Sequence, residues 1–560
     1  MSNRDLPLLL LIVPALASAQ DRSQARSMVI TTRGIVATAQ TLASQAGAQI
    51  LARGGSAVDA AIAANAVLSV VEPMMNGPGG DLFALVFDAK TGSLTGINAS
   101  GWAPAGLSIE YLHKQGMFRM PDSGIHTVTV PGCVAGWEKL HKRFGKLPWR
   151  DLFKPAIYYA DNGFPVTELI QWDWENTNAR LSDEARKLYL PNGAPPKVGE
   201  IFRNPQLGRA LRLIAELGAR AFYDGIVGQA LLETSRKLGG TLAPADLSEY
   251  EPEWVQPIST DYRGWKVSEL PPNGQGIGTL EMLNILENFP LGQYDPMGVE
   301  ALHLKIEADK LAFSDLERYV ADPKFAPVPV TGLLSKPYAK QRAALIDPDK
   351  AHCDVQAGAP AELHGNTTYL STVDKDGNTV SWIQSNSEIF GSGILVQGMG
   401  FLLHDRAAAF TLEADRPNAL APRKRPFHTI IPAFMEQGSQ HIAFGIMRGG
   451  NQPQAQMQFV TNIADHKMNI QAALEAPRFT KPTLGGCDLL MEGRVPEIIR
   501  AQLEQKGHRL QVMGDFSGLM GGGQAVLHDS ATKVNYGASS PRKDGAAIPE
   551  PDPYFPSRAR

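Results

Sequence analysis

Residues 366–385 read NTTYLSTVDKDGNTVSWIQS and carry the clearest hairpin signal of the chain. Two runs rich in β-branched and aromatic residues, 367–373 and 379–385, flank the dipeptide Asp376-Gly377. Such runs on either side of an Asp-Gly pair are typical of two antiparallel strands joined by a tight turn. The sequence therefore predicts a β-hairpin whose open end holds Thr367 and Ser385.

The turn sets which residues of the two predicted strands face each other. With Asp376 and Gly377 as the two central turn residues, Thr368 lies opposite Ser385 and Thr367 lies opposite Asn386. A one-residue bulge would shift the pairing by one position. In either register, Thr367 lies beside the Ser-Asn end of the second strand.

The segment before the hairpin has a different character. Residues 345–365 are polar, contain several Asp, Gly and Pro residues and show no clear period, which indicates an exposed loop. An exposed loop that leads into a strand beginning Asn-Thr-Thr is the arrangement that a backbone cut would need to make a threonine N-terminal. From these residues alone, an ordinary strand start is the favoured interpretation, because Thr is a common β-former.

The N-terminal half of the chain predicts a layered body of helices and strands. Ser56 precedes an apolar run, Ala57–Val71, which we expect to form a buried helix that ends at Glu72-Pro73. Buried strands are expected at residues 82–87 and 127–130. Ala-rich helices and short Val/Ile strands continue to about residue 345, which indicates an α/β or α+β fold.

Composition excludes several classes of protein. The 560 residues are 43% hydrophobic and 20% charged with a formal net charge of −4, so neither a disordered chain nor a basic nucleic-acid-binding protein is expected. The three cysteines, Cys133, Cys353 and Cys487, are too few and too scattered to predict a disulfide framework. The sequence contains no CxxC pair and no HExxH motif, so no metal and no other cofactor is expected.

The N-terminus differs from the rest of the chain. No internal apolar run reaches the roughly 18 residues that a membrane span needs, so no stable membrane insertion is expected. Residues 6–17, in contrast, are almost wholly apolar, and Ala17-Ser18-Ala19 offers a small-x-small cleavage site. We therefore expect a signal peptide at residues 1–19 and a periplasmic or secreted protein. The alternative is a true start at Met28, which would make the protein cytoplasmic.

A series of short motifs extends from about Thr38 to Pro553, and each is weak alone but specific in combination. They are GGSAVDAA (54–61), NGPGG (76–80), APA (103–105), VPG (130–132), PPNG (271–274), NTT (366–368), VDKDGN (373–378), FGSG (390–393), KRP (424–426), GG (449–450) and PRKDGA (541–546). In this order they resemble the γ-glutamyltransferase family of N-terminal-nucleophile (Ntn) hydrolases.

The resemblance implies a fold and a maturation step. The fold is an α+β, four-layer αββα sandwich built from two chains cut from one precursor. The cut would fall between Asn366 and Thr367, giving a large subunit (residues 20–366) and a small subunit (residues 367–560) whose first residue is the nucleophile. The two processed chains would form a heterodimer, and a dimer of heterodimers is left open.

The resemblance also assigns roles to residues of the hairpin and of one glycine pair. Thr367 takes the place of the nucleophile, and Thr368 that of a second threonine that positions it. Ser385 stands where the family has a threonine that hydrogen-bonds the nucleophile. Gly449-Gly450 corresponds to the loop whose backbone N–H groups stabilise the tetrahedral oxyanion.

The positions that hold a γ-glutamyl group differ from the family pattern. Glutathione-type members bind the α-carboxylate with an Arg before Ala-Pro-Ala and with two Ser after the Lys-Arg-Pro motif. Here Ser100 replaces that Arg, and His428-Thr429 replace the two Ser. The groups that hold the α-ammonium are replaced by Ser387, Arg406 and Ala409. Loss of a bidentate Arg and of a counter-charge weakens the binding of a zwitterionic head group.

These departures predict the class of substrate. We expect a small-molecule amide whose acyl part carries a carboxylate but no α-ammonium, as in the cephalosporin acylase and oxamate amidohydrolase branches of the family. In this interpretation Arg406 and His428 make the acyl pocket more positive. The alternatives are a true γ-glutamyltransferase or glutathione hydrolase and, from another class, an inactive relative kept for binding.

Overall fold

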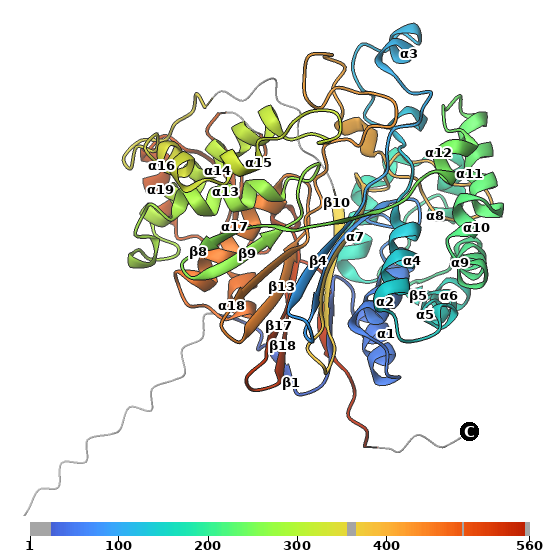
Figure 1. The fold of residues 1–560 in the computed structure, drawn as a ribbon, viewed down its shortest axis with the longest axis horizontal. Coiled ribbons are helices and arrows are strands. Elements are labelled where there is room, and N and C mark those ends of the chain that lie inside the picture. The colour runs from blue at the N-terminus through green and yellow to red at the C-terminus, as the bar shows by residue number, and fades with distance from the viewer. Residues whose placement is uncertain (1–23, 356–365, 484–485, 555–560) are drawn as a thin grey trace, which may run out of the picture.

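Two antiparallel sheets of seven strands lie face to face at the centre of the computed structural model, which describes residues 24–355, 366–483 and 486–554 (Figure 1). The first sheet has the order β19-β2-β10-β11-β3-β4-β7, and the second has the order β1-β18-β17-β13-β12-β9-β8. The strands of the first sheet are Ala546–Pro549, Ile35–Thr38, Asn366–Val373, Thr379–Ser387, Asp81–Asp88, Ser93–Ala99 and Glu253–Val255. Those of the second are Val29–Thr31, Val534–Ser539, Gly523–Asp529, Gln440–Ile446, Ala433–Gln437, Trp265–Glu269 and Ile258–Tyr262. The signal peptide expected at residues 1–19 lies outside the described residues.

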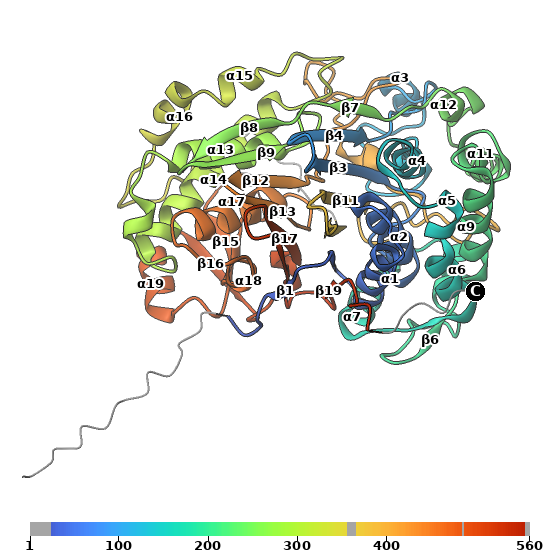
Figure 2. The same cartoon turned by 60° about the horizontal axis from the view of Figure 1, so that its bottom comes forward.

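Helices cover the outer face of each sheet (Figure 2). Helices α1 (Thr41–Ala52) and α2 (Ala57–Val71) pack on the first sheet, and α13 (Gly276–Leu286) and α17 (Asn451–Ala464) pack on the second. The layer between the sheets is apolar and contains Phe83, Tyr369, Ile383 and Phe434, each at most 1% exposed. The expected four-layer αββα fold is confirmed.

The expected helix and strand of the N-terminal half form as the sequence predicts. Helix α2 spans Ala57–Val71, and all of its residues are buried. A reciprocal pair of hydrogen bonds between Ser56 and Asp59 caps its N-terminus, which satisfies two backbone donors that would otherwise be unpaired. Strand β3 (Asp81–Asp88) contains the predicted strand at residues 82–87.

The central hairpin forms between β10 and β11, but its register differs by one residue from that of a two-residue turn. Thr368 pairs with Gln384 instead of Ser385. The cause is the loop, in which Gly377 adopts a φ of +88° and its N–H donates to the carbonyl of Asp374 (3.1 Å). A left-handed glycine after a tight turn adds a residue to the loop and shifts the pairing. Of the two registers considered from the sequence, the one shifted by a single residue is therefore the one that forms.

Three expectations from local sequence need correction. Residues 127–130 are not a strand: Ile125–Thr127 is a 3₁₀ helix, and Pro131 follows before any ladder forms. Within the described part of loop 345–365, Ile346 and Ala351 are buried rather than exposed. Cys353 and Cys487, although 134 residues apart, form a disulfide. Scattered spacing could not predict this pair, because only the fold brings the two residues together.

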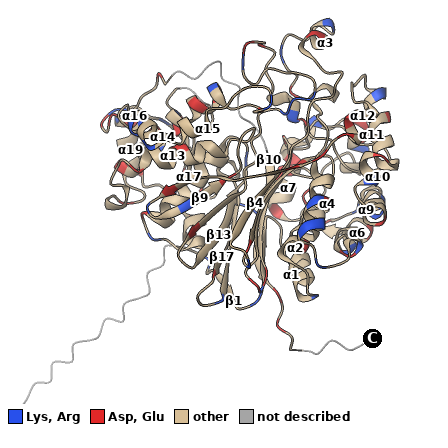
Figure 3. Ribbon diagram, in the orientation of Figure 1, with Lys and Arg blue, Asp and Glu red and all other residues tan. Residues whose placement is uncertain are grey.

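The charged residues lie mainly on the outer helices, whereas the central strands carry few (Figure 3). No helix within the described residues is long and apolar enough to cross a membrane.

Candidate active site

The open end of the hairpin is irregular at Thr367. Asn366 pairs with Ser387, and the register then shifts, so that both Ser385 and Asn386 lie opposite Thr367. Such a bulge bends the strand and re-aims the side chain. The structure therefore brings Thr367 and Ser385 to the same end of the hairpin, in the interior of the protein.

One side chain that contacts Thr367 was not found from the sequence. Gln452, in the first turn of α17, donates from Nε2 to Oγ1 of Thr367 at 3.3 Å. The Oε1 of the same amide accepts the backbone N–H of Ile431 (3.1 Å), which fixes its orientation. The only local signal was its position two residues after the Gly449-Gly450 pair.

Thr368 belongs to a buried ionic network. Its Oγ1 donates to Glu72 at 2.8 Å, and Lys543 lies 3.3 Å from the other carboxylate oxygen of Glu72 and 2.6 Å from Asp173. Burial raises the pKa of Glu72, while Lys543 and the Thr368 hydrogen bond act in the opposite direction. The network ties the strand that carries Thr367 to the end of α2 and to the PRKDGA motif.

Gly449 and Gly450 lie at the N-terminus of α17. Gly449 has a φ of +44°, and Gly450 is the N-cap residue. Within the described part of the chain, the backbone N–H groups of these two glycines donate no hydrogen bond. Two free donors at the positive end of a helix dipole are suited to bind a negatively charged oxygen.

Asp81 is the centre of a second polar group beside the hairpin, and its strand partner in β11 is Ser385. Its carboxylate accepts from Nε2 of His428 (2.9 Å) and from the backbone N–H of Gly101 (3.1 Å), and Nδ1 of His404 lies 3.1 Å from it. Burial and the nearby Arg406 lower the pKa of His428 to about 3. The expectation that His428 adds positive charge to the pocket is therefore wrong, because its imidazole is neutral.

Arg406 lies in the same group and is 1% exposed. Its Nη1 donates to Oγ1 of Thr429 (2.9 Å), and its Nε lies 3.7 Å from Asp81. Within the described residues, Nε and Nη2 are buried without a hydrogen-bond partner. Buried guanidinium donors that lack a partner are costly, so they point to a missing ligand.

Gln275 links this group to the glycine loop. Its Nε2 donates to the carbonyl oxygens of both Thr429 (2.6 Å) and Gly449 (2.9 Å). Gln275 therefore connects Thr429, and through its side chain Arg406, to the glycine loop at the N-terminus of α17.

The remaining two predicted site residues are also buried. Ser100 accepts from Nδ2 of Asn273 (3.2 Å), and its carbonyl accepts from Arg425 (2.9 Å), so it is held within a structural network. Ser387 adopts a φ of +75°, and its N–H donates to Oγ of Ser385 (2.7 Å). This contact positions the hydroxyl of Ser385 at the open end of the hairpin.

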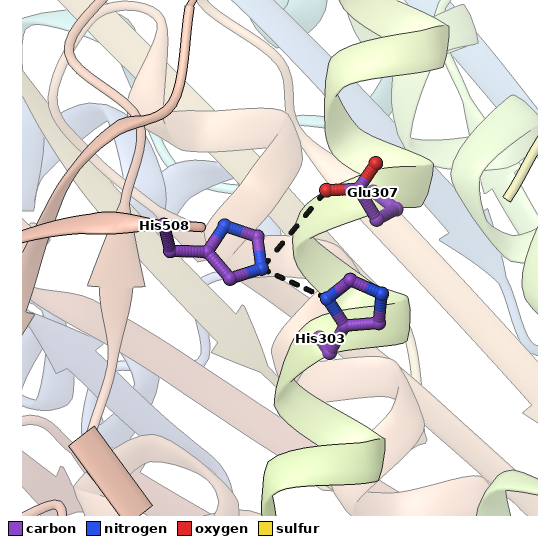
Figure 4. Close-up of side chains that lie close together, drawn as sticks. All are labelled: His303, Glu307 and His508. Carbon is purple, nitrogen blue, oxygen red and sulfur yellow. Dashed lines mark hydrogen bonds and ion pairs between the residues drawn. The ribbon is translucent and has the colours of Figure 1, made fainter. Parts of the chain in front are cut away.

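One further cluster has the side chains of a metal site. His303 and Glu307 on α14 (Val299–Tyr319) face His508 in the loop before β16 (Arg509–Met513), and all three are buried (Figure 4). Nδ1 of His303 lies 2.8 Å from Nε2 of His508. However, Lys310 already supplies a cation 2.6 Å from Glu307. Burial and the neighbouring lysines lower the pKa of His508 to about 3. The surroundings are therefore already positive.

A four-layer αββα body with a buried threonine at the open end of its central hairpin is the arrangement of an Ntn hydrolase. The family model described as gamma-glutamyltranspeptidase matches residues 43–550, and the chain belongs to this family. It is accordingly an amidohydrolase or acyltransferase of the Ntn type.

Two curated relatives and one solved structure cover nearly the whole chain. The glutathione hydrolase-like YwrD proenzyme of Bacillus subtilis is 37% identical over 93% of this chain and 99% of its own length. The oxamate amidohydrolase proenzyme of Klebsiella pneumoniae is 32% identical over 92% and 98%. The crystal structure of cephalosporin acylase from Bacillus halodurans matches with a TM-score of 0.89 and 40% identity, over 97% of this chain and 100% of that one.

Proposed function

We propose that the protein is a proenzyme that cuts its own backbone between Asn366 and Thr367 and then uses Thr367 as an N-terminal nucleophile. The single observation that carries this proposal is that the buried hydroxyl of Thr367 accepts a hydrogen bond from Gln452, whose own N–H bonds to the carbonyl of Gly449, in a loop where the N–H groups of Gly449 and Gly450 donate no hydrogen bond within the described residues. Both curated relatives are named as proenzymes, which supports the cut. Residues 20–366 and 367–560 would then form a heterodimer.

In the maturation step, Oγ1 of Thr367 attacks the carbonyl carbon of Asn366. The carbon–nitrogen bond breaks, and the acyl chain moves from nitrogen to oxygen. Water then hydrolyses the ester and releases the carboxylate of Asn366 and the α-amine of Thr367. This amine has an ordinary pKa near 8 and belongs to the same residue as the hydroxyl, so it can act as the base that activates Oγ1.

The same groups would then act on the substrate. The α-amine takes the proton of Oγ1 as the oxygen attacks the amide carbon, and the N–H groups of Gly449 and Gly450 bind the oxyanion. The proton passes to the leaving amine, and an ester to Thr367 remains. Water or another amine resolves this ester, which gives hydrolysis or transfer. Thr368, through Glu72, and Ser385, through Ser387, hold the nucleophile in position.

The acyl group of the substrate carries a carboxylate and no α-ammonium in this proposal. Arg406 supports it, because its Nη2 is buried without a partner next to Thr429 and the glycine loop. Ala409 offers no counter-charge for an ammonium. The neutral imidazole of His428 offers none either. Two similar proteins carry acylase and oxamate amidohydrolase names, which fits an acyl group of this kind.

Steady-state kinetics on matched anilides test the acyl preference. Glutaryl-p-nitroanilide should be turned over with a kcat/KM at least tenfold above that of γ-glutamyl-p-nitroanilide, which differs by one α-ammonium. Arg406→Gln should remove this difference by raising KM for the glutaryl compound. Efficient turnover of the γ-glutamyl compound or glutathione with little glutaryl activity would favour the true γ-glutamyltransferase. Cleavage without any turnover would favour the inactive relative.

We further propose that residues 1–19 are a signal peptide and that the enzyme acts in the periplasm or outside the cell. The Cys353–Cys487 disulfide supports export, because such bonds persist in oxidising compartments. N-terminal sequencing of the large chain from the native cell tests this, with Gln20 expected as the first residue.

A further inference from the structure

A cavity of about 550 Å³ lies at the start of α17, and Arg406 is not among the described residues that line it. Gly450, Asn451 and Gln454, at the start of α17, form one wall of it. The charged side chains that line it are Arg180, Arg448, Lys481 and Glu388, so three cations face it and one carboxylate. Gln452, in the same helical turn, contacts Thr367, which places the cavity next to the nucleophile.

Arg448 is the cation in this cavity that is available to a ligand. Its side chain makes no hydrogen bond or ion pair within the described part of the chain, whereas Arg180 is paired with Asp405 at 2.7 Å. Arg448 has a φ of +95°, a conformation that a residue with a side chain adopts at a cost. The loop therefore holds Arg448 against its backbone preference, directly before Gly449.

A second side chain in the cavity also lacks a partner. Both amide atoms of Asn451 are buried without a hydrogen bond among the described residues, and the residue is 6% exposed. A buried amide normally finds partners, so an unpaired one beside a free guanidinium indicates a polar ligand. The amide can donate to a carboxylate oxygen that Arg448 binds through its fork.

We infer that this cavity binds the amine half of the substrate and that Arg448 and Asn451 hold a carboxylate on it. The inference rests on the proposed function, because it uses the site of the scissile amide. A carbonyl oxygen held by Gly449 and Gly450 places its acyl half toward Arg406 and Thr429. The nitrogen half then points to the cavity wall formed by Gly450 and Asn451. The leaving amine or acceptor is thus an amino acid or another amine with a carboxylate.

Two amides that differ only in the leaving amine test this inference. Glutaryl-4-aminobenzoate carries the carboxylate, and glutaryl-4-aminobenzamide is its neutral analogue. Arg448→Gln should raise KM for the benzoate at least tenfold and leave KM for the benzamide within twofold, with normal cleavage at Thr367. Arg448→Lys should recover part of the loss, and the control Arg416→Gln, at a half-buried arginine that does not line the cavity, should change neither. Equal effects on both substrates would overturn the inference.

Calorimetric titration with free 4-aminobenzoate separates this inference from the proposed function. If wild type hydrolyses neither amide, the proposed function fails. Binding of 4-aminobenzoate that is lost in Arg448→Gln would still support the carboxylate site. Equal binding of 4-aminobenzoate and 4-aminobenzamide to the wild type would overturn it.

The disulfide carries a second, independent inference. Cys353 precedes the proposed cut and Cys487 follows it, so the bond joins the two chains that the cut creates. Contacts of the Figure 4 cluster hold the same segment of the large chain. His303, drawn in Figure 4, donates to the carbonyl of Asp347 (2.8 Å), and Lys310, the ion-pair partner of Glu307, donates to the carbonyl of His352 (3.0 Å).

We also propose that the mature enzyme is a covalently linked heterodimer, which again rests on the proposed cut. A cross-link makes the association of the two chains intramolecular, so their contact would survive dilution. Denaturing electrophoresis should give one band without reductant and two bands with it. Cys353→Ser should give two bands in both conditions, while Cys133→Ser, a change at the buried free thiol, should behave as wild type.

Absence of the cross-link and absence of the cut would give different patterns on the same gel. Two wild-type bands without reductant would overturn the cross-link but leave the cut intact. A single wild-type band in both conditions would mean that no cut occurs, and both proposals would then fall.

Discussion

Two buried polar clusters, one around Thr367 and one around His303, differ in how fully their donors and acceptors are used. Around Thr367, the N–H groups of Gly449 and Gly450 and two nitrogens of Arg406 have no hydrogen-bond partner within the described residues. Around His303, Glu307 is bonded to Lys310 and His352 and His303 bridges to Asp347, and of the ring nitrogens of His303 and His508 one, Nδ1 of His508, has no hydrogen-bond partner within the described residues. Since buried polar groups are usually paired, unpaired donors mark the cluster that binds a ligand. The paired cluster holds chain segments together.

The largest expected effect is that of Thr367→Ala. Removal of Oγ1 should abolish both the cut and turnover, a loss of at least about a thousandfold, because this oxygen is the attacking atom in both proposed steps. Electrophoresis and an amidase assay measure both. Thr367→Ser, which keeps a hydroxyl, should retain cleavage. An alanine variant with wild-type turnover would remove the distinction between the two clusters.

Gly450→Pro should reduce kcat by about 10²–10³-fold, because it deletes one oxyanion donor. The φ of Gly450, −66°, already suits proline, so the backbone should hold its shape. Gly450→Ala is the matched control, since it keeps the N–H and should retain most activity. A proline variant as active as the alanine variant would show that this N–H does not bind the oxyanion. Circular dichroism checks the fold of both.

Glu307→Gln should lower the stability of the protein and leave its turnover nearly unchanged, which is the opposite of the effects expected at Thr367 and Gly450. It leaves the buried Lys310 without its counter-charge, which should lower the free energy of unfolding by about 3 kcal/mol. At a temperature where the variant is folded, kcat should be within twofold of wild type. Chemical denaturation and kinetics on the same preparation give both values. A large loss of kcat without a loss of stability would make this cluster functional.

The last expected effect is on the pH dependence of stability, and it is small at any single pH step. The pKa of His508 is lowered to about 3 in the folded protein, so the unfolded chain binds more protons between pH 6.5 and pH 3. This histidine should therefore reduce the free energy of unfolding as pH falls through this window, by up to about 1.4 kcal/mol per pH unit. His508→Gln should flatten the acid side of the stability profile. An unchanged slope would mean that His508 is protonated in the fold.

Much of the fold could be predicted because it depends on local patterns. The capped apolar run Ala57–Val71 and the paired runs around Asp376-Gly377 each identify an element by themselves. The exact register could not be predicted, because it depends on the left-handed conformation of Gly377. The strand expected at residues 127–130 failed because β-propensity alone does not supply a neighbouring strand.

The site could be predicted only in part, for a similar reason. The family motifs point to Thr367 and Gly449-Gly450, but neither motif nor spacing identifies Gln452 or the free state of Arg448. The sequence also could not show that His428 is neutral, since its pKa depends on burial and on Arg406. Pairings that join distant segments, such as Cys353 with Cys487, become visible only in the fold.

Intact-mass analysis of the purified, reduced protein addresses the central claim most directly. The account predicts two polypeptides, of which the smaller has the mass of residues 367–560 with a free α-amine on Thr367. The Thr367→Ala protein should give a single uncut mass under the same conditions. An intact wild-type chain that still hydrolyses amides, or a small chain that begins at any other residue, would contradict the account.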